Sequence, residues 1–356
     1  MDFGLSEDQQ LFAQSLRGFL SDRVPMDRVR TVMESASGHD AVLIAQLAEQ
    51  GVTGILVPEK HGGSGLGLLD AAIAAQELGR AATPFSFHSA AVVAPLLLAQ
   101  AGNEELTGPW LSRIAEGKAL IGLALAAPAL RGGTLSGTVG FAMDAASADA
   151  LLVVAGSGSD TRVLLLPRDT PGMTVTALST VDDTRRVAEV GFENVAAEGH
   201  VLELADAATA VERAVDAGRV VLAADALGAA ERSLELAVQY ALTREQFGRV
   251  IGSFQAVKHM CAEVFAEVEP VRSLLWYAAF AWDDGREDAA TMAALVKSHG
   301  TEAATEATTT CIQVYGGMGF TYECDMHVWF KRAGYDRQML GGPSALREKA
   351  AAALIA

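Results

Sequence analysis

Apolar residues in the first third of the chain recur at the spacing of an α-helix. Between Ser6, which can cap a helix, and Pro25, which ends one, leucine and phenylalanine side chains fall three and four residues apart. A glycine-rich loop follows at residues 55–67. Further segments with the helical pattern span residues 41–50, 69–80, 89–101 and 104–116. The pattern predicts an N-terminal helical domain over residues 1–118.

The pattern changes at Ala119 to short runs of apolar and β-branched residues. Clusters of Gly, Pro, Asp and Ser separate these runs at intervals of about ten residues, which is typical of strands joined by turns. The predicted strands span residues 121–125, 151–155, 162–167, 174–178 and 187–192. A β-domain is therefore predicted over residues 119–202.

Helical patterning returns near residue 203 and continues to the end of the sequence. Phe254, Val257, Cys261 and Val264 begin an apolar stripe with steps of three and four residues. The predicted helices span residues 204–242, 250–283, 287–315, 323–338 and 343–355, with glycines between most of them. Residues 203–356 are thus predicted to form a helical bundle, and the whole chain an α+β fold that is mostly α.

Composition and charge exclude several classes of protein. Half of the 356 residues are apolar, which is ample for a large core. With 27 basic and 44 acidic residues the net charge is −17, and no basic run is present, so neither nucleic acid nor an anionic membrane surface is expected as a partner. Three cysteines at unrelated spacings predict reduced thiols, with neither a disulfide framework nor a metal site.

The sequence also predicts a cytoplasmic protein. Its first residues are acidic where a secretory signal would be basic. The most apolar run, residues 89–101, is interrupted by Pro95 and is too short to span a bilayer.

Residues 243–259 join two of the predicted helices and carry a possible ligand-binding set. Arg244 supplies a fixed cation, Phe247 an aromatic ring and Gln255 a carboxamide, and Gly248 and Gly252 tolerate unusual backbone angles. Such a set could hold a flat ligand that bears a phosphate. Taken alone, it is better interpreted as an ordinary corner between two helices.

Three motifs in this order give the chain a resemblance to a known family. Val57-Pro58-Glu59-Lys60-His61-Gly62-Gly63-Ser64-Gly65 lies in the first helical region, residues 244–259 form the corner, and Gln313-Val314-Tyr315-Gly316-Gly317-Met318-Gly319-Phe320 follows a long helix. Together with the order of helices, β-domain and bundle, they resemble the acyl-CoA dehydrogenase family over essentially the whole chain.

The resemblance implies a fold, a cofactor and a reaction. The fold would have an N-terminal helical domain, a middle β-domain and a C-terminal four-helix bundle. FAD would be the cofactor, an acyl thioester of coenzyme A the substrate, and an electron-transfer flavoprotein the expected electron acceptor. In this family a glutamate removes the α-proton while the β-hydrogen leaves as a hydride, and the enzymes assemble as homotetramers or as heterotetramers with a second acyl-CoA dehydrogenase chain.

The resemblance also implies which residues bind the cofactor. An arginine fork suits pyrophosphate oxygens, and paired glycines let the backbone approach a ligand. In the family, both groups reach an FAD that is held mainly by the neighbouring subunit. The residues that match the family's contacts to the pyrophosphate and adenosine of FAD are Arg244, Phe247 and Gln255, together with Gln313, Gly316 and Gly317.

Asp216 and Arg219 match family positions that line the acyl-CoA site. They are three residues apart and therefore share one face of the predicted helix. An ion pair within the helix explains them equally well, so both interpretations stay open.

The chain departs from the family at both positions where a catalytic base occurs. Counting from Gly319-Phe320, the usual base position is Leu340, and the alternative position directly before Arg219 is Gly218. Neither side chain can accept a proton, so no catalytic residue is assigned. Glu323 is interpreted as structural, and Asp336 is expected in an exposed ion pair at a helix end.

The segments expected to contact a flavin are also altered. The segment Leu125-Ala126-Ala127-Pro128-Ala129-Leu130-Arg131-Gly132-Gly133 keeps a proline but lacks the family's hydroxyl group. Phe141-Ala142-Met143 replaces an aromatic-x-Thr element, and Gly342 and Ser344 replace a threonine and a glutamine. The groups offered to a neighbour's FAD are therefore present, while those for this chain's own flavin are weakened.

This combination resembles the base-deficient subunit of the heterotetrameric acyl-CoA dehydrogenases that act on steroid side chains in actinobacteria. Three alternatives stay open at this point. One is a self-sufficient homotetramer with a displaced base, for which Asp216, Glu323 and Asp336 are the candidates. Another is a flavin-dependent monooxygenase on the same fold, and the last is an assembly protein without a ligand.

Overall fold

A computed structural model describes residues 4–126 and 128–355. Two compact units can be distinguished in it. The helical unit comprises residues 1–29, 68–83 and 219–356, and the unit that carries the sheet comprises residues 30–67 and 84–218. The three-domain division 1–118, 119–202 and 203–356 stays a prediction. None of the described helices combines the length and apolar character that a membrane crossing requires.

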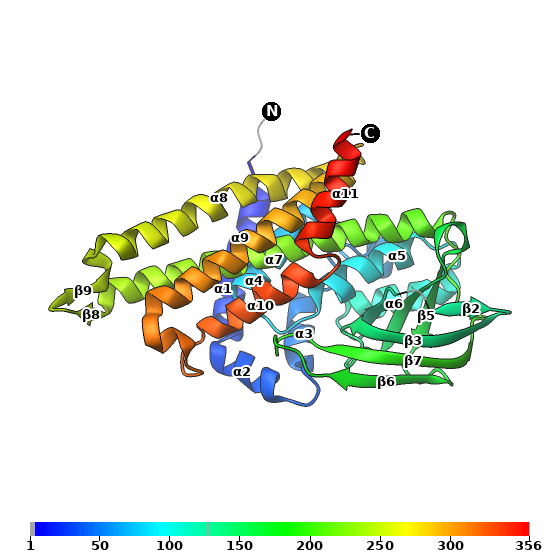
Figure 1. Ribbon diagram of the computed structural model, residues 1–356. Coiled ribbons are helices and arrows are strands. Elements are labelled where there is room, and N and C mark those ends of the chain that lie inside the picture. The colour runs from blue at the N-terminus through cyan, green and yellow to red at the C-terminus, as the bar shows by residue number, and fades with distance from the viewer. Residues whose placement is uncertain (1–3, 127, 356) are drawn as a thin grey trace. The chain divides into compact units, whose positions relative to one another are not determined.

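The helical unit is built around a long antiparallel helix pair, α8 and α9, with the second half of α7 alongside (Figure 1). The predicted apolar stripe faces the core from Val264 onward, at Val264, Val268, Val271 and Leu275, while its first members, Phe254, Val257 and Cys261, are only partly buried. The helices of this unit are α1 (Glu7–Arg23), α4 (Leu68–Arg80), α7 from Arg219 to Thr243, α8 (Gln255–Asp283), α9 (Ala289–Tyr315), α10 (Met326–Gln338) and α11 (Pro343–Ile355).

Two glycines allow α4 and α7 to pack at unusually close range. A Cβ atom on Gly79 would lie 2.0 Å from the carbonyl oxygen of Asp225, and one on Gly228 would lie 1.9 Å from that of Gln76. Because no side chain fits in either gap, the two backbones themselves are in contact.

The other unit contains one mixed sheet with the strand order β5-β4-β1-β3-β7-β6, and β2 pairs with β3. β1 and β4 run parallel, with Ile121 opposite Ala150, while the other pairings are antiparallel. The strands are β1 (Ile121–Ala124), β2 (Ala129–Arg131), β3 (Thr134–Met143), β4 (Ala150–Ala155), β5 (Arg162–Pro167), β6 (Met173–Leu178) and β7 (Val187–Ala196).

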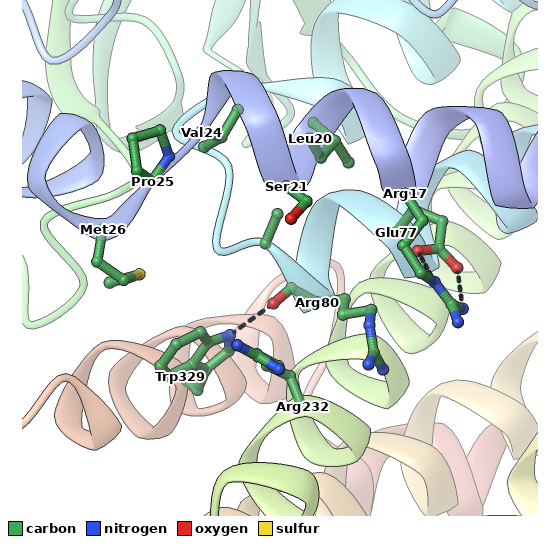
Figure 2. Close-up of a pocket in the computed structure, with 11 residues that line it drawn as sticks. Arg17, Leu20, Ser21, Val24, Pro25, Met26, Glu77, Arg80, Arg232 and Trp329 are labelled. Atoms are coloured by element: carbon green, nitrogen blue, oxygen red, sulfur yellow. Dashed lines mark hydrogen bonds and ion pairs between the residues drawn. The ribbon is translucent and has the colours of Figure 1, made fainter.

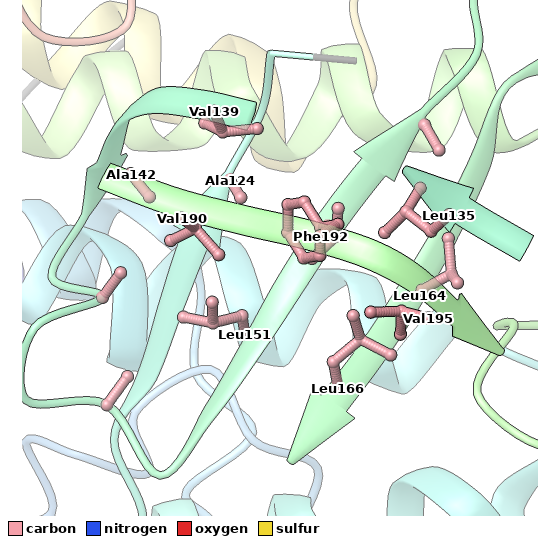
Figure 3. Packing of buried hydrophobic residues seen from close by; sticks show 14 of the residues in the cluster. Ala124, Leu135, Val139, Ala142, Leu151, Leu164, Leu166, Val190, Phe192 and Val195 are labelled. Atoms are coloured by element: carbon pink, nitrogen blue, oxygen red, sulfur yellow. The ribbon is translucent and has the colours of Figure 1, made fainter. Parts of the chain in front are cut away.

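One face of this sheet holds an apolar core (Figure 3). Leu135, Leu151, Leu164 and Val190 are fully buried there, and the ring of Phe192 lies among them. The same unit contains α3 (Ala41–Glu49), the π-helix η2 (Phe87–Val93), α5 (Ala94–Gln100), α6 (Glu104–Ala115) and the first turns of α7, which begins at Ala207.

The sequence pattern missed some elements. Strand β3 crosses the sheet between β1 and β7, but Gly137, Gly140 and two register shifts interrupt its alternation of buried and exposed residues. The helix α2 (Met26–Glu34) follows Pro25 directly, because a proline ends one helix yet is well tolerated at the beginning of the next.

Candidate cofactor-binding site

The predicted corner between two helices is a β-hairpin. Glu245–Gln246 (β8) pairs with Arg249–Val250 (β9), so the predicted helical start at residue 250 is wrong, and α8 begins at Gln255. The two turn residues, Phe247 and Gly248, have φ angles of 55° and 76°. A two-residue hairpin turn of type I′ requires positive φ at both positions, and for a phenylalanine this conformation is strained.

The turn presents the ring of Phe247 to solvent. Its side chain is 92% exposed and touches the ring of Phe254 edge-on, with 6.2 Å between ring centroids. The guanidinium group of Arg249 covers the same Phe254 ring at 4.1 Å. An exposed aromatic ring held in a strained turn is available to stack on a flat ligand.

Arg244 and Gln255 flank this hairpin, and both are exposed. The backbone of Arg244 is held at both ends, since its N–H donates to Tyr240 and its carbonyl accepts from Ile251, each at 2.8 Å. Gln255 is the first residue of α8, where free backbone N–H groups and the helix dipole favour an anion. The segment therefore combines a cation, an aromatic ring and helix N–H donors.

The second motif lies at the end of α9. Gly316 has φ 62° and ψ −138°, and a Cβ atom on Gly316 or Gly317 would meet nothing within 4 Å, so both face open space. Gln313, one turn earlier, is exposed. These residues form an open backbone surface that a ligand could approach closely.

A tyrosine pair brings the two motifs to the same end of the helical unit (Figure 1). The rings of Tyr240 on α7 and Tyr315 on α9 stack with 4.2 Å between centroids, and the hydroxyl of Tyr315 donates to the carbonyl of Leu236 at 3.2 Å. Burial raises the pKa of Tyr315 to about 12, so it stays a neutral donor. The six cofactor-binding residues expected from the sequence thus come from two neighbouring segments.

The position of the family's base lies in a tightly held turn. Leu340 and Gly341 have φ angles of 55° and 110°. The Nε of Arg219 donates to the carbonyl of Leu340 at 2.8 Å. The alternative base position, Gly218, is buried within α7, as is Asp216. Arg219 therefore contacts the base-position turn, while a substrate-binding role for Asp216 and Arg219 stays a prediction.

Asp336 differs from expectation because it is fully buried in α10 instead of exposed at the helix end. Its carboxylate acts on Lys297, a fully buried lysine that the sequence reasoning overlooked. The signal was available, since Lys297 is four residues from both Ala293 and Thr301 on the buried face of α9. Glu323 is exposed, as its structural interpretation allows.

A cavity of about 300 Å³ lies elsewhere in the helical unit, among α1, α4, α7 and α10 (Figure 2). Arg17 donates two hydrogen bonds to Glu77, at 2.8 and 2.6 Å, and the indole of Trp329 donates to the carbonyl of Arg80 at 3.1 Å. None of the expected cofactor-binding residues lines this cavity. Arg80 and Arg232, which also line the cavity, both pair with Glu235 on α7, so the charged groups around the cavity serve to join these helices.

A buried polar cluster in the sheet-carrying unit was also missed. The carboxylate of Asp144 accepts hydrogen bonds from the hydroxyls of Ser86 at 2.6 Å and Ser89 at 2.5 Å, and the Nε2 of His88 lies 3.3 Å away. Asp144 directly follows Phe141-Ala142-Met143 and has a φ of 57°. Ala127, in the altered flavin segment, lies outside the described residues.

Comparison with known proteins places this geometry in a family. The profile described as "Acyl-CoA dehydrogenase, N-terminal domain" matches residues 6–118, and "Acyl-CoA dehydrogenase, C-terminal domain" matches residues 208–355. The chain belongs to the acyl-CoA dehydrogenase family. FAD is the usual cofactor of this family, whose members oxidise acyl-CoA thioesters, and the α+β fold expected from the sequence is confirmed.

The similar proteins include a curated dehydrogenase, a chain of a two-component complex and a chain of a steroid acyl-CoA dehydrogenase. The chain is 32% identical to acyl-CoA dehydrogenase IpdE2 of Mycobacterium tuberculosis, over 95% of this chain and 94% of that protein. The ChsE4–ChsE5 complex of Mycobacterium tuberculosis contains a chain that is 26% identical, with a TM-score of 0.90 and coverage of 100% and 99%. A chain of the Tcur3481–Tcur3483 steroid ACAD is 28% identical, with a TM-score of 0.88 and coverage of 98% of both chains.

The described residues fit the FAD that the family implies. Open space above Gly316 and Gly317 admits a ligand, and no ion pair in the described part of the chain uses the side chain of Arg244. Within the described residues, no group of three or more His, Cys, Asp or Glu side chains is placed to hold a metal ion.

Proposed function

We propose that this acyl-CoA dehydrogenase chain is the base-deficient subunit of a heterotetramer, and that it completes the FAD site of a partner chain that carries the base. The observation that carries the proposal is the turn at residues 339–342. Arg219 holds the backbone of this turn through a hydrogen bond from its Nε to the carbonyl of Leu340 at 2.8 Å, yet the side chain at the base position is a leucine.

The residues at the hairpin end have the chemistry that this role needs. The guanidinium group of Arg244 would bind the pyrophosphate oxygens, and the exposed ring of Phe247 would stack on a flat ring system. Gln255 would add donors at the start of α8, while Gly316 and Gly317 let the α9 end approach the adenosine side. When bound, FAD supplies the acceptor for the hydride that leaves the β-carbon of the acyl group.

The partner chain would supply the proton acceptor for the α-carbon. A thioester α-proton is weakly acidic, so removing it needs a positioned carboxylate together with hydrogen bonds to the developing enolate oxygen. The side chains of leucine and glycine at the two base positions of this chain cannot accept that proton. The steroid-type neighbour favours a steroid-derived acyl thioester as substrate. The family resemblance and a neighbour described as an electron transferring flavoprotein favour such a protein as the acceptor.

The test is to express this chain alone and together with a base-bearing acyl-CoA dehydrogenase chain. Alone, we expect less than one FAD per chain and no oxidation of a steroid side-chain CoA ester or of butyryl-CoA. The co-expressed chains should form a complex that holds FAD and oxidises the acyl-CoA. Stoichiometric FAD and normal turnover by the isolated chain would refute the proposal and favour a homotetramer with a displaced base, which Asp336→Asn and Glu323→Gln would then locate.

A further inference from the structure

The cavity among α1, α4, α7 and α10 has no part in the proposed function (Figure 2). Its volume of about 300 Å³ lies at the small end of the range for ligand pockets, which is about 300–1,000 Å³. At the roughly 30 Å³ that a water molecule occupies in the liquid, it has room for about ten non-hydrogen atoms. An acyl-CoA or a dinucleotide is far too large, so the size of the cavity selects a small molecule.

Part of the cavity wall is apolar. Leu20 and Val24 of α1 and Trp329 of α10 are buried side chains that line it, and Met26 adds a partly buried thioether. The indole N–H of Trp329 donates to the carbonyl of Arg80 at 3.1 Å, so the polar edge of this ring is already satisfied within the protein. The remaining surface favours contact with an apolar or aromatic group.

The rest of the wall is charged. Three guanidinium groups and one carboxylate line it, namely Arg17, Arg80, Arg232 and Glu77. Arg17 donates to both oxygens of Glu77, so this pair is neutralised by its own geometry. Arg80 on α4 is engaged by Glu235 of α7 and lies 4.0 Å from Glu231. These two arginines therefore have carboxylate partners on a neighbouring helix.

Arg232 is the exception among the three. Within the described residues, its guanidinium group makes one hydrogen bond, from Nη1 to Oε2 of Glu235 at 3.4 Å, which is long for such a bond. Both residues belong to α7, so this contact joins no helices. In Figure 2 the side chain of Arg232 extends toward Trp329, and it is 35% exposed. Most of its five N–H donors are thus left to a ligand.

We propose that this cavity binds a small organic carboxylate, with the two oxygens on the guanidinium group of Arg232 and a ring or compact apolar body against Trp329, Leu20 and Val24. The guanidinium fork matches the geometry of a carboxylate. Inorganic phosphate would bind the arginine but leave the apolar wall uncovered, while a neutral apolar molecule would leave the arginine without an anion. The site needs neither a partner chain nor FAD.

Calorimetric titration of the full-length chain with three probes tests both halves of the site. Phenylacetate has a carboxylate and a ring, phenylacetamide lacks the charge, and acetate lacks the ring. We expect phenylacetate to bind at one site per chain, and each of the other two to bind at least about tenfold more weakly. Phenylacetate should also change the tryptophan fluorescence, and Trp329→Phe should remove that change.

Arg232→Met should weaken phenylacetate binding at least about tenfold, to the level of phenylacetamide with the wild-type chain. Lys118→Met, which removes a positive charge at an exposed position of the other unit, is the matched control and should leave binding unchanged. Arg232→Lys keeps the charge but loses the fork, so it should fall between the two, and it decides the question if Arg232→Met does not fold.

Three results would each overturn the site: no binding of phenylacetate, equal affinity for the acid and its amide, or wild-type affinity in both variants of Arg232. Because the isolated chain is titrated without FAD or an acyl-CoA, failure here would leave the proposed function untouched.

Discussion

Single charged side chains in the helical unit depend on the partner that the fold gives them. Arg332 is fully buried and donates from Nε and Nη2 to the two carboxylate oxygens of Asp225, at 2.6 and 2.7 Å, and from Nη1 to the carbonyl of Thr83 at 3.0 Å. Lys297 is equally buried but has only two long contacts. Arg332 is thus paired with a carboxylate at hydrogen-bond distance, whereas Lys297 has two longer contacts and the charge of the nearby Asp336.

Removing Arg332 alone should destabilise the protein strongly. Arg332→Met leaves the carboxylate of Asp225 buried without its cation, which we expect to lower the free energy of unfolding by about 3–5 kcal/mol. The double variant Asp225→Leu with Arg332→Met removes both charges, so its free energy of unfolding should fall much less. Urea denaturation of both variants checks this, and a double variant as unstable as the single one would show that the pair is not a coupled unit.

Removing Lys297 should change how global stability depends on pH. The pKa of Lys297 in the folded protein is about 7, below its value in the unfolded chain. Between these values the unfolded state binds more protons, so wild-type stability should rise with pH, with a contribution of up to about 1.4 kcal/mol per pH unit. Lys297→Met should lose this slope in urea denaturation at pH 7, 8 and 9, whereas Lys118→Met should retain it.

At the level of secondary structure, a hairpin turn and a close helix–helix contact position the candidate site residues. The β8–β9 hairpin fixes where Arg244, Phe247 and Gln255 point, and the contact of α4 with α7 fixes the helix that carries Arg219. Both features depend on backbone conformations that the residue pattern alone does not reveal, since they need positive φ angles or missing Cβ atoms.

Relieving the strain in the hairpin should separate stability from function. Asparagine tolerates positive φ better than phenylalanine, so Phe247→Asn should leave the stability of the isolated chain unchanged or raise it by up to about 1 kcal/mol. The same variant should weaken FAD retention in the complex with the partner chain, because the exposed ring is lost. Thermal unfolding and flavin content measure the two effects, and unaltered flavin content would argue against a stacking role.

Adding one methyl group between α4 and α7 should strongly destabilise the protein. Gly228→Ala would place a Cβ atom 1.9 Å from the carbonyl oxygen of Gln76, so the helices must separate, and we expect a loss of about 3 kcal/mol or more. Gly334→Ala, on α10, meets nothing within 4 Å and should instead gain up to about 1 kcal/mol from helix propensity. Chemical denaturation compares the two, and similar stabilities would contradict the close packing.

For the molecule as a whole, the proposed function makes the cofactor site dependent on assembly with a partner chain. In the complex with a base-bearing partner, Arg244→Ala should weaken FAD binding at least about tenfold, because a charge-assisted contact to phosphate is lost. Arg23→Ala, an exposed arginine at the end of α1, is the matched control and should leave FAD binding unchanged. Equal FAD affinity in both variants would remove Arg244 from the site.

Much of this architecture could be predicted from the chain. The helices at residues 69–80, 287–315 and 343–355 were expected within two residues of their observed bounds, because amphipathic periodicity and glycine punctuation are local signals. β3 was missed because its glycines and register shifts break the alternation, and pairing with β7 is a long-range interaction that compensates for weak local preference.

The amino-acid order alone was enough to identify the family, and it predicts the motifs that would contact FAD and the loss of a base at Leu340 and Gly218, since these depend on residue identity and spacing. Only the folded chain shows that Lys297 and Asp336 are buried together, and that Arg219 reaches the carbonyl of Leu340. Arg219 and Leu340 are 121 residues apart in sequence, and their contact exists only because α7, α9 and α10 pack into one core. Burial and charge compensation depend on neighbours from several helices, and spacing along one helix does not encode them.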